Sequence, residues 1–301
     1  MKFVCVGHAT YDILLPLDKF PIENSRNYTD RKIECGGGPA ATAAYLLAKW
    51  NMKTTFVGVV GNDHYGTSII KEFNEIGVNT DYIEKNNDFE TDVSYIIASK
   101  ERGSRTVITS KKNKIPSLYE PVNIDDADVI LLDAHHPITA KEILLKNPNA
   151  ISILDASHVN EDTYDLGKMV NYFICSKEYA ENFTKIKIDY NNFESLIAIY
   201  ETLNMHFKTN ILITLEEHGV FTKLEEYVII PSIRVNTVDS TGAGDIFHGA
   251  FAYFIANKYN IKAAIKYANI AGALSTTKVG SRNAIVDSSE ILKCVENVEL
   301  L

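Results

Sequence analysis

The chain has 301 residues, 46% of them hydrophobic and 10% aromatic, which is enough for one large folded domain or two modest ones. Its formal net charge of -9 argues against nucleic acid as a partner, because no basic face is available for phosphate backbones. The four cysteines are far apart and too few for a disulfide framework. The first apolar run is too short for a signal peptide, and no run approaches a membrane span, so we expect a cytoplasmic protein without membrane contact.

Short apolar runs ending in Gly, Asp or Ser alternate with stretches of helical period, which is typical of strand-helix units in a parallel sheet. Strands are predicted at residues 3–6, 55–60, 129–132, 151–154, 172–174 and 211–214. Helices are predicted at residues 40–50, 66–76, 140–145 and 193–203, with two more between 244 and 277 that separate near Asn260. The predicted fold class is therefore α/β.

Two stretches, at about 11–34 and 89–110, break this rhythm. Both alternate polar and apolar residues, as in Val93, Tyr95 and Ile97, which suits a half-exposed antiparallel sheet. We predict a small β lid inserted into a single domain that spans residues 1–301, since no repeat or linker divides the chain. A lid excludes water from a reaction centre, and its exposed face also suits a homodimer contact.

The segment 235–254 carries the clearest chemical signal. A short extended run meets a turn with Gly242, Ala243 and Gly244, and a strongly apolar helix follows at once. Bare amides at the turn and the helix N-terminus form an anion hole. Asp245, in the same place, can accept the proton of an attacking hydroxyl while those amides neutralise a moving phosphoryl group. An ordinary helix capped by Asp239, Ser240 or Thr241 explains the same local spacing without a ligand.

Residues 239–245, Asp-Ser-Thr-Gly-Ala-Gly-Asp, resemble the Asp-Thr-x-Gly-Ala-Gly-Asp signature of the ribokinase-like (PfkB) carbohydrate and nucleoside kinases, although Ser240 replaces its usual Thr. The resemblance implies a three-layer α/β fold with a mostly parallel central sheet and a small β lid. It also implies ATP-dependent phosphorylation of a small molecule, most simply a sugar, with Asp245 as the catalytic base.

The N-terminal part is similar to the family as well. Asp12 looks like the family's substrate-binding Asp, and residues 36–40, Gly-Gly-Gly-Pro-Ala, look like its N-terminal glycine motif. The similarity implies that Asp12 holds sugar hydroxyls and that the backbone of Gly37 and Gly38 lies close to the sugar. A strand-to-helix turn with Pro at the helix start is the structural alternative for the glycines.

Further likenesses concern ATP and metal ions. Residues 211–215 and Gly219 are similar to the strand and loop before the family's nucleotide site, which makes Thr214 and Gly219 nucleotide-binding candidates, and Gly280 belongs to a loop resembling the one that borders adenine. The same similarity makes Asp239 and Thr241 candidates for binding a monovalent cation such as K⁺.

Three departures from the family limit what the resemblance implies. Ala41 stands where many members have a sugar-contacting Asn, so the sugar's identity cannot be inherited. The motif that organises Mg²⁺ is not intact, and Glu178 is a candidate to replace its Glu. The glycine motif lacks the Lys of many sugar-phosphate kinases, which favours a neutral sugar or a nucleoside. Cations in the predicted lid, such as Arg105, suit either an anionic substrate group or the protection of an edge strand.

Three functions therefore stay open: a sugar kinase, a nucleoside kinase with an aromatic base platform supplied by residues such as Tyr11 or Tyr95, and a sugar- or nucleotide-binding regulator without catalysis. P-loop and dinucleotide motifs are absent from the sequence. The adjacent His135 and His136, with Asp133 and Asp155, lack ligand-like spacing, and a hydrogen-bonded surface pair is favoured over a metal site.

Overall fold

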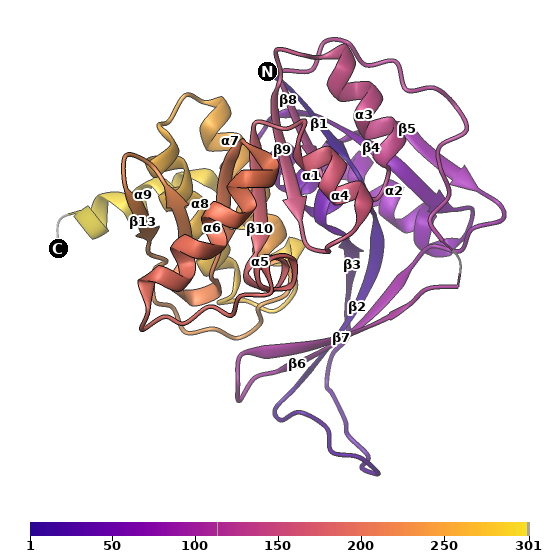
Figure 1. The fold of residues 1–301 in the computed structure, drawn as a ribbon. Helices are drawn as coiled ribbons and strands as arrows, with labels where there is room; N and C mark the ends of the chain where they lie inside the picture. The colour runs from indigo at the N-terminus through magenta and orange to yellow at the C-terminus, as the bar shows by residue number, and fades with distance from the viewer. Residues whose placement is uncertain (113, 300–301) are drawn as a thin grey trace.

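The computed structural model describes residues 1–112 and 114–299, and its centre is a large sheet with helices on both faces (Figure 1). The strands of this sheet are β1 (Lys2–Val6), β4 (Lys53–Gly61), β5 (Asn79–Asn86), β8 (Val129–Leu132), β9 (Ile151–Ala156), β10 (Tyr172–Ser176), β11 (Asn210–Thr214), β12 (Val220–Lys223) and β13 (Tyr227–Ile230). Their order is β13-β12-β11-β10-β9-β8-β1-β4-β5, and all neighbours pair in parallel except β11 with β12 and β12 with β13. The predicted mostly parallel sheet is confirmed.

The helices divide between the two faces according to the alternation of strand side chains. They are α1 (Pro39–Lys49), α2 (His64–Ile76), α3 (Pro137–Lys146), α4 (Glu161–Gly167), α5 (Lys177–Thr184), α6 (Phe193–Phe207), α7 (Ala243–Ala256), α8 (Ile261–Ser275) and α9 (Ser288–Glu299). Phe3 and Cys5 on β1 belong to the core formed with α1, α2, α7, α8 and α9, whereas Val4 and Val6 belong to the core formed with α3 to α6. None of the helices in the described part of the chain has the length and apolarity needed to cross a membrane.

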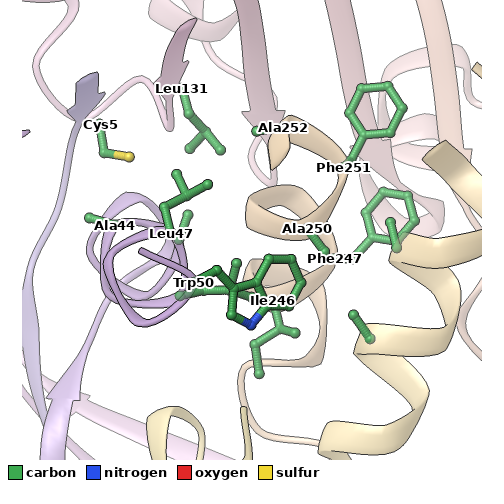
Figure 2. Packing of buried hydrophobic residues seen from close by; sticks show 14 of the residues in the cluster. Cys5, Ala44, Leu47, Trp50, Leu131, Ile246, Phe247, Ala250, Phe251 and Ala252 are labelled. Carbon is green, nitrogen blue, oxygen red and sulfur yellow. The ribbon is translucent and has the colours of Figure 1, made fainter. Parts of the chain in front are cut away.

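Close packing of α1 against α7 fixes the positions of two helix N-termini. Figure 2 shows Ala44, Leu47 and Trp50 of the α1 region facing residues of α7 such as Ile246. Gly249 lets the backbones approach, because a Cβ there would lie 3.1 Å from the Cα of Ala43. Small residues on both helices therefore bring the turns that precede α1 and α7 to the same region.

A second, four-stranded sheet extends away from the helices (Figure 1) and is called the small sheet below. It consists of β2 (Thr10–Leu17), β3 (Ile33–Gly37), β6 (Val93–Ser99) and β7 (Ser104–Ser110), in the order β3-β2-β6-β7. The antiparallel arrangement expected for the lid strands holds for β2 with β3 and for β6 with β7. It is wrong for the central pair, since β2 and β6 run parallel. The long connection through β4 and β5 brings the chain back in the same direction.

Candidate functional site

A pocket of about 230 Å³ lies where the helix N-termini, the strand ends of the large sheet and the small sheet meet. Five of the predicted site residues line it, from segments far apart in the sequence: Asp12, Gly38, Thr241, Gly242 and Asp245. Ligands in open α/β sheets bind at such strand ends. The structure therefore brings the two predicted motifs, residues 36–40 and 239–245, to one site.

The N-terminus of α7 has no side-chain cap. Its N-cap residue is Gly242, with φ at 73°, and no side chain bonds the first amides. The first hydrogen bond of the helix runs from the amide of Ile246 to the carbonyl of Gly242 at 2.9 Å. The amides of Gly244 and Asp245 precede it and therefore have no acceptor within the helix. The capped-helix alternative is wrong, and the turn keeps the properties of an anion-binding site.

Asp245 lies in the first turn of α7, beside a second carboxylate at the end of β9. Burial, together with the negative charge of Asp155, raises the pKa of Asp245 to about 7. Burial likewise raises the pKa of Asp155 to about 7, with the charge of Asp133 adding to it. His248, one helical turn after Asp245, has its Nδ1 3.3 Å from Asp155 and 2.7 Å from the carbonyl oxygen of Gly244. Asp245 is thus poised to exchange a proton near neutral pH.

Asp12 is buried on β2 and faces the glycine turn before α1. It accepts a hydrogen bond from Thr10 Oγ1 at 3.0 Å, and burial raises the pKa of its carboxyl despite that bond and the charge of Arg282. A Cβ on Gly37 would lie 2.2 Å from the Asp12 carboxylate. Arg282 in turn donates to the carbonyl of Gly37 at 3.3 Å and pairs with Glu72 at 2.8 Å. The glycine turn is therefore held from both sides against Asp12.

Asp133, at the end of β8, connects the segments behind the pocket. Its carboxylate accepts from the amides of His8 at 2.9 Å and Ala40 at 3.2 Å, and from Nδ1 of His135 at 2.9 Å. Burial alone would raise the pKa of Asp133, but the charge and hydrogen bond of His135 hold it at about 2. The description of His135 and His136 as a surface pair is wrong, because His136 is only 4% exposed and His135 lines the pocket. No group of three or more metal-ligating side chains is found among the described residues.

The remaining predicted residues lie outside the lining of this pocket. Asp239 is buried and accepts from the hydroxyl of Thr241 at 2.6 Å and the amide of Gly280 at 2.8 Å, which ties the two loops together. Ala41 is fully buried in α1. Thr214 lies at the end of β11, Gly219 in a turn with φ at 97°, and the exposed Glu178 in the first turn of α5. Gly37, Ala243 and Gly244 belong to the two glycine turns but are also outside the lining. Their functional roles stay predictions.

Arg105 reaches the pocket from β7 of the small sheet. Its Nη1 donates to Ser240 Oγ at 2.8 Å, next to the glycine turn of α7. The sequence placed Arg105 on the lid without a partner, and it gave no sign of Asp155 and His248 as neighbours of Asp245. The sequence could have indicated Asp155 through its position at the end of a predicted strand, where ligands bind in open α/β sheets.

An uncapped helix N-terminus with Asp245 in its first turn and the buried carboxylate of Asp12 in the same pocket suits the transfer of an anionic group to a hydroxyl. Comparison with known proteins agrees. The pfkB family carbohydrate kinase model matches residues 1–288, and the chain belongs to this family of phosphotransferases, which have an alcohol group as acceptor.

Individual relatives cover nearly the whole chain. Ribokinase from Bacillus subtilis is 26% identical over 302 residues, covering 97% of this chain and 98% of that protein. Deoxyribokinase from Salmonella typhi is 27% identical over 305 residues, covering 94% and 95%. The structure of Arabidopsis thaliana ribokinase complexed with ribose and ATP superposes with a TM-score of 0.76 at 22% identity, covering 97% of each chain. The ribokinase-like fold is confirmed.

Proposed function

We propose that this chain transfers the γ-phosphoryl group of ATP to a hydroxyl of a small sugar, with Asp245 as the base. The observation that carries this proposal is the position of Asp245 in the first turn of the uncapped α7, in the same pocket as Asp12. Asp245 accepts the proton of the sugar hydroxyl, the freed oxygen bonds to the γ-phosphorus, and the bond to the leaving ADP breaks. The amides of Ala243, Gly244 and Asp245 stabilise the charge on the moving group.

Asp12 orients the sugar in this proposal. Its carboxylate accepts hydrogen bonds from sugar hydroxyls, and the close approach of Gly37 and Gly38 leaves room for the ring above the turn. The small sheet acts as the lid of a single domain, with Arg105 bonding Ser240 across the pocket in support. Homodimerisation through the exposed face of the same sheet is part of the proposal, since Tyr95 and Ile108 are exposed there.

ATP brings Mg²⁺ with it, since Mg²⁺ keeps several waters and needs only one or two carboxylates besides the phosphates. Glu178 is exposed in the first turn of α5 and suits at most a contact through water. K⁺ at Asp239 and Thr241 is compatible with their position beside the anion hole, although their hydrogen bonds to each other already explain both residues structurally.

A sugar is favoured over a nucleoside as acceptor. A nucleoside needs an aromatic platform for its base, and the described pocket lining holds no Tyr, Phe or Trp. Of the four aromatic residues available for that platform, Phe20, Tyr28 and Tyr95 are exposed, and the half-buried Tyr11 lies outside the described lining. The similarity to proteins named ribokinase and deoxyribokinase supports the same choice.

The test is Asp245→Asn, assayed by ADP release across hexoses, pentoses, keto-sugars, sugar acids and nucleosides. Because only proton removal is lost, we expect turnover to fall about 10²–10⁴-fold while ATP and sugar binding stay nearly unchanged by calorimetry. Asp165→Asn, an exposed carboxylate paired with Lys141, is the matched control and should turn over normally. Equal turnover of Asp245→Asn and the parent would contradict the role of Asp245, and no ADP release with any sugar would favour the regulator.

A further inference from the structure

Strand β7 presents a row of side chains to the pocket. Arg105, Val107, Thr109 and Lys111, the residue directly after the strand, alternate along the chain and all line the pocket. Arg105 and Lys111 are six residues apart, which is about 20 Å in an extended chain. Arg105 contacts Ser240 beside the α7 turn. The row therefore places one cation next to the phosphoryl-transfer centre and a second one well away from it.

His135 lies with Lys111 at this distal end. It lines the same pocket, and the positive charge of Lys111 acts on it, although burial first and then Asp133 have the larger effects on its pKa. The net result is a pKa of His135 above its ordinary value, because the charge and the hydrogen bond of Asp133, with a smaller effect of the Asp155 charge, together outweigh burial. Asp133 occupies Nδ1 at 2.9 Å, which turns Nε2 away from Asp133. Among the described residues no hydrogen bond of Nε2 is found.

At this end of the pocket, the acidic side chains lie behind the basic ones. Asp92 and Asp133 are 1% and 4% exposed and do not line the pocket, whereas Lys111 and His135 do. Asp92 lies 3.1 Å from Nε2 of His8, but its oxygen is 3.9 Å from Nζ of Lys111, too far for a hydrogen bond. Lys111 thus forms an ion pair with the buried Asp92 without a hydrogen bond, and its ammonium keeps its donors for another group.

Protection of an edge strand is the simpler explanation for a lysine here, since β7 is at the edge of the small sheet. That explanation fits the next residue better. Lys112 pairs with the exposed Glu90 at 2.5 Å and does not line the pocket, whereas Lys111, whose side chain is also more than half exposed, does line it. A neutral sugar needs no cation at the distal end, because the carboxylates Asp12 and Asp245 already serve its hydroxyls.

We propose that the sugar accepted by this chain carries an anionic group, a carboxylate, phosphate or sulfonate, which Lys111 and His135 bind at the end of the pocket away from Asp245. This inference rests on the proposed function and names its substrate class. It replaces the preference for a neutral sugar that the missing Lys of the glycine motif suggested, because Lys111 supplies the charge from a different element.

The experiment compares matched sugars in the ADP-release assay: ribose with its monophosphates, and glucose with glucuronate and with its phosphate and sulfonate derivatives at the same carbon. We expect at least one anionic sugar to exceed its neutral counterpart about 10-fold or more in kcat/KM. Lys111→Gln should lower that preference about 10–100-fold, mainly through KM, and His135→Gln should lower it less. Lys112→Gln is the control that should leave the preference unchanged.

The arms of the series identify which anion is bound. Two results would overturn the proposed anionic substrate but not the proposed kinase function. One is a wild-type preference for neutral sugars, and the other is an equal loss of kcat/KM on both members of a pair in Lys111→Gln. Absence of Asp245-dependent ADP release with every sugar would instead overturn the proposed function and this inference together. Calorimetric titration of Asp245→Asn with the same sugars gives a second readout, in which the anionic member should bind more tightly.

Discussion

Two glycine turns begin the helices that point into the pocket, and they need glycine for different reasons. Before α1, a Cβ on Gly37 would lie 2.2 Å from the Asp12 carboxylate, and one on Gly38 would lie 2.3 Å from the carbonyl oxygen of His8. In α7, a Cβ on Gly244 would meet nothing within 4 Å, and Gly244 has helical backbone. The first turn is explained by the protein's own packing, whereas nothing within the protein requires glycine at position 244.

Because only the turn before α1 is explained by packing within the protein, we infer that the two glycine motifs have separate roles. The turn at Gly36–Gly38 shapes a rigid surface around Asp12, and Arg282 and Glu72 hold that surface from behind. The turn at Gly242–Gly244 leaves its amides uncapped, with Gly242 lining the pocket and the exposed Gly244 following it. In the proposed function the space beside Gly244 belongs to the phosphoryl group, so substitution there should affect chemistry without affecting the fold.

Among substitutions in the two glycine turns, Gly244→Ala gives the largest expected effect. A helical Gly replaced by Ala should stabilise the protein by about 0.5–1 kcal/mol, since no protein atom opposes the new methyl group. The same methyl group occupies the proposed phosphoryl position, so kcat/KM should fall about 100-fold or more. Steady-state kinetics and urea unfolding of one preparation measure both quantities.

Gly242→Ala is the comparison for that variant. Its φ is 73° and its Cβ would lie 2.6 Å from the Cβ of Ser281, so we expect it to lose stability as well as activity. If Gly244→Ala kept full activity, the space beside Gly244 would have no role in transfer, and the contrast between the two turns would fail.

Gly38→Ala tests the turn before α1. Its effect on kcat/KM should be smaller than that of Gly244→Ala. A side chain at φ 92° that also meets the His8 carbonyl should cost about 3 kcal/mol of unfolding free energy. Gly77→Ala is a matched control, because Gly77 has φ 91° and its Cβ would meet nothing within 4 Å. It should cost about 1–2 kcal/mol from backbone strain alone. Equal costs for the two variants in urea unfolding would remove the packing explanation of Gly38.

Local patterns predicted much of this arrangement. Apolar runs identified the strands of the parallel core, because strands buried on both faces are nearly continuous hydrophobic segments, and Gly242 to Asp245 identified the turn of α7. The alternation in Val93, Tyr95 and Ile97 indicated β6. The parallel pairing of β2 with β6 was missed because it depends on the path of the intervening chain.

Charged partners were harder to predict than backbone elements. Lys111 and His135 line the pocket, whereas Asp155 and His248 lie behind Asp245, and their interactions arise only when the sheet order brings separate elements together. The elements β5, β12, β13, α4, α5 and α9 were also missed. Strands β12 and β13 have four residues each and α4 has seven, which is too short for a clear period, and tertiary contacts decide such segments.

The pH dependence of kcat/KM sharpens the assignment of Asp245 and has the smallest expected effect. Burial and the charge of Asp155 raise the pKa of Asp245 to about 7, and the base acts only when deprotonated. About half of the enzyme is therefore active at pH 7 and nearly all of it above about pH 8, and kcat/KM should fall about tenfold per pH unit well below pH 7. Asp155→Asn removes a neighbouring negative charge, which lowers the pKa of Asp245, so the acid limb of the profile should move to lower pH. Asp165→Asn should leave the limb in place, and an unmoved limb in Asp155→Asn would show that another group controls the profile.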